Sequence, residues 1–390
     1  MTVTAVSGFV AAGTACGVKP SGMPDLALVA TADGSAVTAA GVFTSNKMTA
    51  APVLVCRQHL VATGGRAVAV VLNSGNANAA TGSQGLIDAE QMCVLTAAEL
   101  GCASDEVLVC STGWIGYQLP MDAITLGIPV VVATLDPDGG QAAATAIMTT
   151  DTVPRTTLVD AHGFTVGGIA KGAAMLEPNM ATMLAVLTTD AEVDAATATT
   201  LLQNAVAGSF NCLTVDGAES TNDTVLLLAS GAAGPVDPAT LGDALNEACG
   251  DLAVQMADDA EGATKTVFLT VKGAATDAEA LKAARDTANC QLVKCSWYGE
   301  DPYWGRIASE MGAAGISFDP ATLTISYGGT LVYDLGEPVE PTNDQAKTLA
   351  QHMAGRQLDL VVDLGQGAGS ARVVTTDLSH AYIDENMRTS

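Results

Sequence analysis

The sequence predicts a mixed α/β protein whose sheets contain antiparallel strand pairs. Short apolar segments rich in β-branched residues alternate with longer segments whose apolar residues recur every three or four positions, the patterns of strands and of amphipathic helices. Two of the strand-like segments are joined by Gly328–Gly329, which is typical of a hairpin. Because the order of the elements is irregular, we expect mixed or antiparallel sheets and not a doubly wound parallel sheet.

The expected strands are short apolar segments bounded by Gly, Asn, Asp or Ser, residues that favour turns. They are Leu26–Thr31, Ala67–Leu72, Val107–Cys110, Thr224–Leu228, Val267–Val271, Leu323–Tyr327 and Thr330–Tyr333. Helical periodicity is clearest in Gly85–Leu100, Leu241–Ala257 and Asp277–Asn289. A domain boundary is expected near Ala274–Asp277.

A glycine-rich segment, Gly365–Gly369, follows the strand-like residues Leu358–Leu364. A dinucleotide-binding loop would lead into a helix whose N-terminus holds a pyrophosphate. The residues that follow, Ala371–Thr376, have the pattern of another strand, so we interpret the segment as a hairpin turn. The four histidines are widely separated and lack zinc-ligand spacing, and the sequence therefore predicts no metal site.

Composition excludes several classes of partner. The 390 residues, a length typical of two or three domains, include 42 acidic and 16 basic side chains and carry a formal net charge of −26. Such a surface repels phosphate backbones and anionic lipids, so we expect neither nucleic acid nor a membrane as partner. Nine cysteines without a Cys-x-x-Cys pair favour reduced thiols over a disulfide framework. We therefore expect a cytoplasmic protein.

The most unusual segment is Lys171–Asp190, in which a glycine-bearing loop passes through Pro178 into an apolar, strand-like run. Thr182 lies where the loop meets that run. A threonine hydroxyl becomes nucleophilic when a base takes its proton, and its own α-amino group, with a pKa near ~7.7–8.0, can be that base. This chemistry requires cleavage of the Ala181–Thr182 bond, by attack of Thr182 on the Ala181 carbonyl. An Ala-Thr dipeptide by itself more often simply opens a strand.

The same segment closely resembles the K-G-x-G-M-x-x-P-x-x-A-T-M-L signature of the ornithine acetyltransferase (glutamate N-acetyltransferase) family, whose members cut themselves between that Ala and Thr. Ten further blocks resemble the family in matching order along nearly the whole chain. They are Gly8–Gly13, Gly41–Asn46, Asn73–Asn78, Ser111–Gly116, Ile147–Thr152, Ser209–Asn211, Thr214–Gly217, Ser220–Thr224, Glu261–Lys265 and Asp301–Arg306.

The resemblance implies a layered αββα fold with mixed sheets and a smaller C-terminal α/β domain from about residue 276 to residue 390. It also implies a precursor that splits into an α chain, residues 1–181, and a β chain, residues 182–390. In the family the two chains remain associated, commonly as an α2β2 heterotetramer.

The resemblance also implies the roles of individual residues. Thr182 would be the nucleophile, and the hydroxyl and peptide N–H groups of Thr112 and Gly113 would stabilise the oxyanion. The implied substrate-binding residues are Thr149, Lys171, Thr182, Glu261, Asn386 and Ser390. The chain departs from the family pattern at Trp114, Ala174 and Tyr303, and its segment from Tyr382 to Ser390 is one residue shorter than that pattern.

The implied reaction is a ping-pong transfer of acetyl from N-acetylornithine to glutamate, a step of arginine biosynthesis that needs no cofactor. Some members of the family also accept acetyl-CoA, and the sequence does not separate the two types. Three other readings stay open: an acetyltransferase of secondary metabolism, a self-processing aminopeptidase or amidase, and an uncleaved, non-catalytic binding paralogue.

Overall fold

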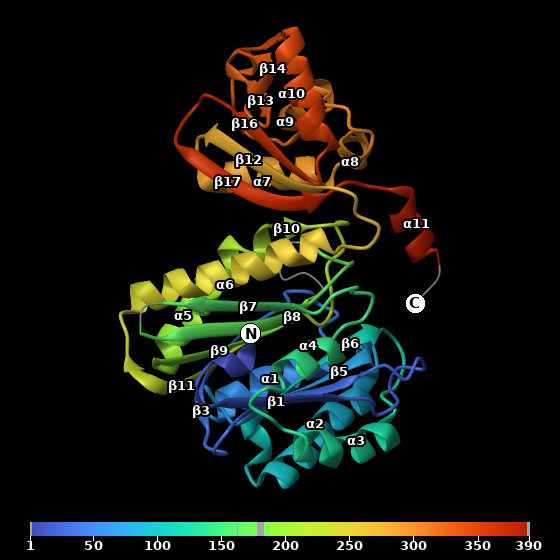
Figure 1. The fold of residues 1–390 in the computed structure, drawn as a ribbon, viewed down its shortest axis with the longest axis vertical. Coiled ribbons are helices and arrows are strands. Elements are labelled where there is room, and N and C mark those ends of the chain that lie inside the picture. Colours follow the sequence, from blue (N-terminus) through green and yellow to red (C-terminus); the bar gives the residue numbers. More distant parts are fainter. Residues whose placement is uncertain (1, 162, 178–182, 388–390) are drawn as a thin grey trace. The chain divides into compact units, whose positions relative to one another are not determined.

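The computed structural model describes residues 2–161, 163–177 and 183–387. Ala181, Thr182 and Ser390, three of the residues singled out above, lie outside this description. The chain divides into two compact units (Figure 1). The first contains the residues up to Asn211 together with Ala218–Met256, and the second contains Cys212–Gly217 and the residues from Ala257 onward.

The first unit contains two mixed β-sheets that pack face to face. In the first sheet the strand order is β1 (Phe9–Thr14), β2 (Leu26–Thr31), β5 (Ala69–Asn76) and β6 (Val107–Trp114). In the second sheet it is β4 (Arg66–Ala67), β3 (Val37–Phe43), β11 (Thr224–Pro235), β9 (Leu184–Glu192), β8 (Thr165–Lys171) and β7 (Arg155–Asp160). The pairs β5/β6 and β9/β11 are parallel. One hydrophobic core joins Val29 and Val70 of the first sheet to Val186 and Leu226 of the second.

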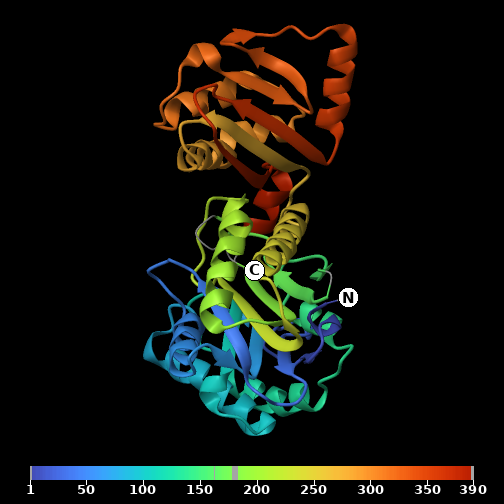
Figure 2. The ribbon, with the colours of Figure 1, turned by 90° about the vertical axis from the view of Figure 1, so that its left-hand side faces the viewer.

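Helices cover the outer face of each sheet. The helices α2 (Gly82–Leu100) and α3 (Met121–Ala133) lie on the first sheet, α1 (Ala51–Ala62) packs against β6 and β3, and α4 (Gly140–Ala146) packs against β1 and β2. The helices α5 (Ala195–Gly208) and α6 (Pro238–Asp258) lie side by side on the second sheet (Figures 1 and 2). The layers are therefore helix, sheet, sheet, helix, which confirms the expected αββα arrangement.

The second unit is built around one mixed sheet. Its strand order is β10 (Leu213–Thr214), β17 (Gly369–Thr376), β12 (Thr266–Ala274), β16 (Gln357–Asp363), β13 (Thr324–Tyr327), β14 (Thr330–Asp334) and β15 (Glu337–Pro338). Its helices are α7 (Asp277–Asn289), α8 (Gln291–Tyr298), α9 (Trp304–Ala313), α10 (Asn343–Ala354) and α11 (His380–Asn386). The strands and helices enclose a separate core around Leu269, Trp297 and Leu360.

Short 3-10 turns complete the elements at Val3–Ala5, Ser104–Glu106, Phe210–Cys212 and Pro320–Thr322. Local signals explain several helix ends. Helix α7 begins after Thr276, whose side chain accepts a hydrogen bond from the N–H of Glu279, as an N-cap residue does. Helix α2 ends at Gly101, which has φ +73°, a left-handed conformation that glycine adopts at little cost.

Two expectations about the C-terminal half need revision. Strands β16 and β17 do not form a hairpin, because β12 lies between them, parallel to β16 and antiparallel to β17. The hairpin reading of Gly365–Gly369 was therefore wrong, although a strand and not a helix does follow it. The expected domain start near residue 276 falls after β12, whereas the second unit includes Cys212–Gly217 and the residues from Ala257 onward, since β12 is a central strand of its sheet.

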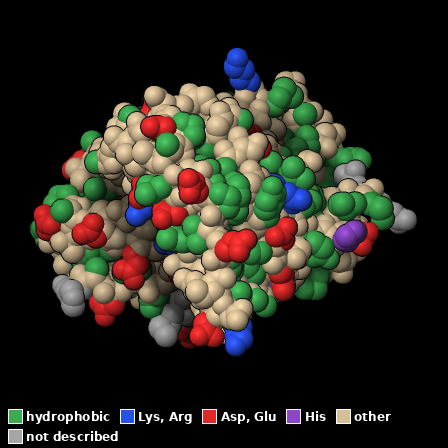
Figure 3. Space-filling model, turned by 90° about the horizontal axis from the view of Figure 1, so that it is seen from above, with side chains coloured by type: hydrophobic (Ala, Val, Ile, Leu, Met, Phe, Trp, Pro, Cys, Tyr) green, Lys and Arg blue, Asp and Glu red, His purple; other side chains and the backbone are tan. Residues whose placement is uncertain are grey.

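The surface carries many acidic side chains. Figure 3 shows Asp and Glu spread over one face, with few Lys and Arg among them. No helix within the described part of the chain is long and apolar enough to cross a membrane.

The loop between β1 and β2 is organised by one buried carboxylate. Asp25 is fully buried and accepts hydrogen bonds from the N–H groups of Cys16 (2.7 Å), Gly17 (3.1 Å) and Lys19 (2.8 Å). Three donors that point inward from a loop would otherwise lack acceptors. The carboxylate therefore fixes the path of the loop toward the end of β5.

We expect Asp25→Ala to lower the free energy of unfolding by roughly 1–3 kcal/mol, because buried N–H groups would lose their acceptor. Asp33→Ala is the matched control, since Asp33 is exposed and accepts one N–H, from Ser35 at 2.9 Å. Urea unfolding measures both. Equal stability of the two variants would contradict the role given to Asp25.

Candidate functional site

Gly113 brings two strands of the first sheet unusually close together. It has φ +129°, and a Cβ atom at this position would lie 2.3 Å from the carbonyl carbon of Gly75 on the neighbouring strand. Gly75 and Gly113 are paired in the parallel register of β5 and β6. Only glycine fits such an approach without displacing the backbone. Thr112, immediately before it, is 3% exposed.

Lys171 contacts this point from the second sheet. It is the last residue of β8, where it pairs with Leu184 of β9, and it is 3% exposed. Its Nζ atom donates a hydrogen bond to Oγ1 of Thr112 at 3.2 Å. The ends of β6 and β8 thus place a buried ammonium beside a hydroxyl and the Gly113 peptide, groups that can bind a carboxylate or stabilise a developing oxyanion.

Asp151 holds the segments around Lys171 in place. Its Oδ2 accepts the N–H of Thr149 at 2.7 Å, and its Oδ1 accepts the N–H of Gly172 at 2.8 Å. The guanidinium of Arg155 also donates to Oδ1. The carboxylate therefore joins the residue that follows Lys171 to Thr149, which the sequence marked as a substrate contact.

The charges around Asp151 determine its protonation. Burial opposes its ionisation, but the positive charges of Lys171 and Arg155 and the N–H donors outweigh burial and hold its pKa well below the usual range. Asp151 is therefore the counter-ion of two buried cations. Sequence reasoning did not single it out, although it lies within the matched block Ile147–Thr152.

Asp223 is a second buried carboxyl at the site. Its Oδ1 accepts the N–H of Met183 at 3.0 Å, the peptide group that follows Thr182 in the chain. Burial raises the pKa of Asp223 well above its usual value, and hydrogen bonds from Met183, Ser220 and Thr44 offset this only in part. This residue also went unnoticed in the sequence, although it belongs to the block Ser220–Thr224.

The neighbouring Asn222 ties the two sheets together. Its side-chain amide donates to the carbonyl groups of Ala77 (2.6 Å), the residue after β5, and of Ser111 (2.9 Å), within β6. The block Ser220–Thr224 therefore has a positional role that its sequence alone does not reveal.

Glu261 and Asn386 belong to the second unit and contact each other. The Nδ2 atom of Asn386 donates to Oε2 of Glu261 at 2.7 Å and to the carbonyl of Tyr382 at 2.9 Å. The hydroxyl of Tyr382 lies 3.2 Å from Oδ2 of Asp216. The two predicted substrate contacts thus lie together, with Glu261 just after α6 and Asn386 at the end of α11.

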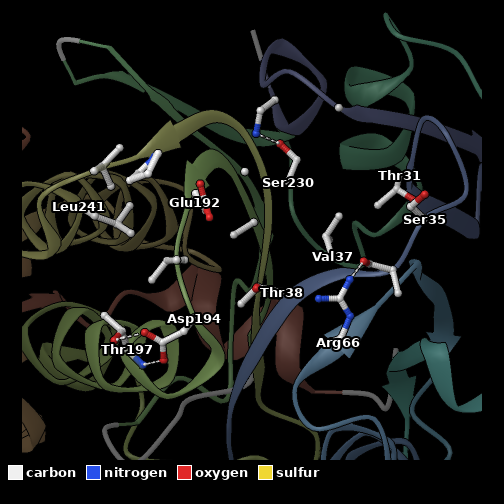
Figure 4. A pocket seen from close by; sticks show the side chains of 18 of the residues that line it. Thr31, Ser35, Val37, Thr38, Arg66, Glu192, Asp194, Thr197, Ser230 and Leu241 are labelled. Carbon is white, nitrogen blue, oxygen red and sulfur yellow. Dashed lines mark hydrogen bonds between the residues drawn. The ribbon is translucent and has the colours of Figure 1, made fainter.

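A cleft of about 830 Å³ lies elsewhere in the first unit. Figure 4 shows Arg66, Glu192, Asp194 and Ser230 among the side chains around it. The strands β9 and β11 reach this cleft with their carboxyl ends, whereas their amino ends adjoin Met183 and Asp223. The cleft is therefore separate from the site around Lys171, and none of the candidate residues lines it.

The described residues give no indication of a metal centre. Within residues 2–161, 163–177 and 183–387, no group of three or more His, Cys, Asp or Glu side chains is placed to hold a metal ion.

Comparison with known proteins gives matches over nearly the whole chain. A model of the ArgJ family matches residues 10–389. The arginine biosynthesis bifunctional protein ArgJ of Mycolicibacterium paratuberculosis is 49% identical, covering 98% of this chain and 95% of its own length. The protein of that name from Streptomyces avermitilis is 45% identical and covers 99% of both chains.

Solved structures were also matched. An ornithine acetyltransferase from Mycobacterium tuberculosis, complexed with ornithine, is 46% identical with a TM-score of 0.43, covering 45% of this chain and 94% of that chain. An arginine biosynthesis bifunctional protein from Bacillus halodurans is 34% identical with a TM-score of 0.48, covering 51% of this chain and 96% of that chain.

We expect Asp151→Ala to lower the free energy of unfolding by about 3–5 kcal/mol, because two buried cations would lose their counter-ion. Denaturant unfolding at neutral pH measures the loss, with Asp160→Ala, an exposed residue at the end of β7, as control.

The difference in stability between the wild type and Asp151→Ala should depend on pH. Since the folded pKa of Asp151 is lowered, its ionisation stabilises the fold above the unfolded pKa of about 3.9 and ceases to do so as the pH falls toward the lower folded value. The difference between wild type and Asp151→Ala should therefore be constant above about pH 5 and shrink below pH 4. A difference that grows on acidification would contradict this assignment.

Proposed function

The chain belongs to the ArgJ family, and on that premise we propose that it transfers an acetyl group from N-acetylornithine to glutamate through an acetyl ester on Thr182. It is an acyltransferase of arginine biosynthesis. One observation supports the proposed chemistry most directly: the hydrogen bond between the ammonium of Lys171 and the hydroxyl of Thr112, beside the constrained peptide of Gly113.

In the first half of the proposed reaction, the free α-amine of Thr182 takes the proton of the Thr182 hydroxyl, which attacks the acetyl carbonyl of N-acetylornithine. The N–H of Gly113 and the hydroxyl of Thr112 stabilise the oxyanion that forms, and one such donor contributes about 3–4 kcal/mol. The C–N bond then breaks, and ornithine leaves with the proton that the amine had taken.

In the second half, the amine of glutamate attacks the ester carbon. The ester C–O bond breaks, the Thr182 oxygen recovers a proton from the attacking nitrogen through the α-amine, and N-acetylglutamate leaves. Covalent catalysis replaces one direct transfer by two easier steps. The same oxyanion donors serve both steps, because both pass through a tetrahedral carbon at the same position.

The proposed substrate contacts divide by charge. Lys171 receives the α-carboxylate as a buried cation, and Thr149, fixed by Asp151, adds a hydroxyl. Glu261 pairs with the side-chain ammonium of ornithine, and Asn386, already bonded to Glu261, adds a donor and an acceptor. Ser390 is proposed as a further contact on the resemblance alone.

The nucleophile requires a cut before Thr182. We propose that Thr182 attacks the Ala181 carbonyl, that the acyl group moves from nitrogen to oxygen, and that water then hydrolyses the ester. The resulting α and β chains, residues 1–181 and 182–390, would remain together as an α2β2 assembly. Core contacts between strands on either side of the cut, such as Ile169 of β8 and Val186 of β9, would hold the two chains together.

The name of the relatives, bifunctional protein, favours a second acetyl donor. We propose that acetyl-CoA can also acetylate Thr182, so that the chain makes N-acetylglutamate by two routes without a bound cofactor. The nine free cysteines favour a reducing compartment, and we propose the cytoplasm.

Intact-mass analysis under denaturing conditions tests the self-cleavage. We expect two fragments split before Thr182 in the wild type and one full-length chain in Thr182→Ala, because the variant has no attacking hydroxyl. Thr182→Ser, which keeps a hydroxyl, is the matched control and should still cleave. If the wild type stays whole, Thr182 has no free α-amine, and the reading as an uncleaved, non-catalytic binding paralogue is favoured.

Initial-rate kinetics test the transfer. We expect parallel double-reciprocal lines when N-acetylornithine and glutamate are varied together, because the acetyl-enzyme forms before glutamate binds. Lines that intersect would exclude the ping-pong mechanism. Release of free acetate without N-acetylglutamate would instead indicate an amidase, in which water is the acceptor.

A further inference from the structure

Lys19 lies against the strand pair that forms the oxyanion site. A Cβ atom at Gly75 would lie 3.0 Å from Cγ of Lys19, so the lysine side chain passes directly over Gly75. Gly75 is the register partner of Gly113 in β5 and β6. The backbone of Lys19 is held there by Asp25. The side chain therefore starts from a fixed position next to the proposed oxyanion donors.

The ammonium of Lys19 belongs to the same electrostatic environment as the site. Burial lowers its pKa, the carboxylates of Asp25 and Asp151 oppose that effect, and the charge of Lys171 adds to it. Such mutual effects require that these groups lie within Coulombic range of one another. Its Nζ atom donates to the carbonyl of Pro24 at 2.7 Å, and an ammonium has three donors.

The two substrates of the proposed reaction carry side chains of opposite charge. Ornithine leaves with a positive side chain, and glutamate arrives with a negative one. Lys171 is proposed to receive the α-carboxylate of either substrate, so the second carboxylate of glutamate needs another cation.

We propose that Lys19 is that cation: a specificity residue that receives the side-chain carboxylate of the acyl acceptor. This inference rests on the proposed function. It assigns the two carboxylates of glutamate to two lysines, Lys171 from β8 and Lys19 from the loop before β2. An acceptor with one carboxylate would use Lys171 alone.

Steady-state kinetics of Lys19→Met test the assignment. We expect the KM for glutamate to rise about 10- to 100-fold, the effect of removing one charge-assisted hydrogen bond, while the KM for N-acetylornithine changes less than about 3-fold. Lys347→Met removes the same charge from an exposed side chain of α10 and is the control. An equal rise in both KM values, or no rise for glutamate, would overturn the proposal.

A charge-conserving variant and a wild-type measurement keep the test independent of folding. Lys19→Arg should retain the glutamate KM within about 5-fold, since it keeps a positive charge at the end of a long side chain. A loss as large as that of Lys19→Met would overturn the proposal. In the wild type, glutarate should inhibit competitively against glutamate at least 10-fold more strongly than pentanoate, its equal-length monocarboxylate. Equal inhibition would also overturn it.

Failure of the proposed function has a different signature. If N-acetylornithine does not acetylate the wild-type β chain, as read by intact mass, the acetyltransferase proposal itself fails. If acetylation is normal and the glutamate preference is insensitive to Lys19, the assignment of Lys19 alone fails.

Discussion

The hydrogen bond between Lys171 and Thr112 is the interaction on which the site depends, because it joins the two sheets of the first unit at their ends. Burying an ammonium costs several kcal/mol unless a counter-ion is present. Asp151 supplies that counter-ion and at the same time binds the N–H groups of Thr149 and Gly172. One carboxylate thereby neutralises the cation and ties Gly172, the residue that follows it, to the segment that contains Thr149. The hydrophobic core brings the sheets together, and this polar network sets the position of their ends.

Local sequence predicted the elements whose ends carry local signals. The bounds of β2 and α7 agree with those expected, since turn and capping residues flank both segments. Strands β6 and β11 continue beyond the expected Cys110 and Leu228, because strand pairing, and not apolar sequence, carries them forward. The pairing of β16 with β12 could not be read from Gly365–Gly369 at all. Strand β12, which lies between β16 and β17, comes from nearly one hundred residues earlier in the chain, and the sequence of the turn does not indicate its presence.

Some residues of the candidate site were likewise predicted from the sequence, and others were not. The resemblance marked Thr112, Gly113 and Lys171, and the structure brings these three together. It marked Glu261 and Asn386 as separate contacts, and the structure joins them by a hydrogen bond. The sequence did not reveal the supporting carboxyls, because an aspartate in a loop looks alike whether it is solvated or buried. Its partners come from distant segments and appear only when the chain folds.

Two buried carboxyls at the site, Asp151 and Asp223, have pKa values that are shifted in opposite directions for physical reasons. Asp151 faces two cations, so its pKa falls, whereas Asp223 faces mainly peptide and hydroxyl donors, so burial dominates and its pKa rises. The positive charges of Lys171 and Arg155 therefore favour the carboxylate form of Asp151, whereas burial favours the neutral form of Asp223. Both proposed substrates carry carboxylates. A shift of Asp223 toward its neutral form reduces the repulsion of these carboxylates and leaves more of the positive charge of Lys171 available for binding.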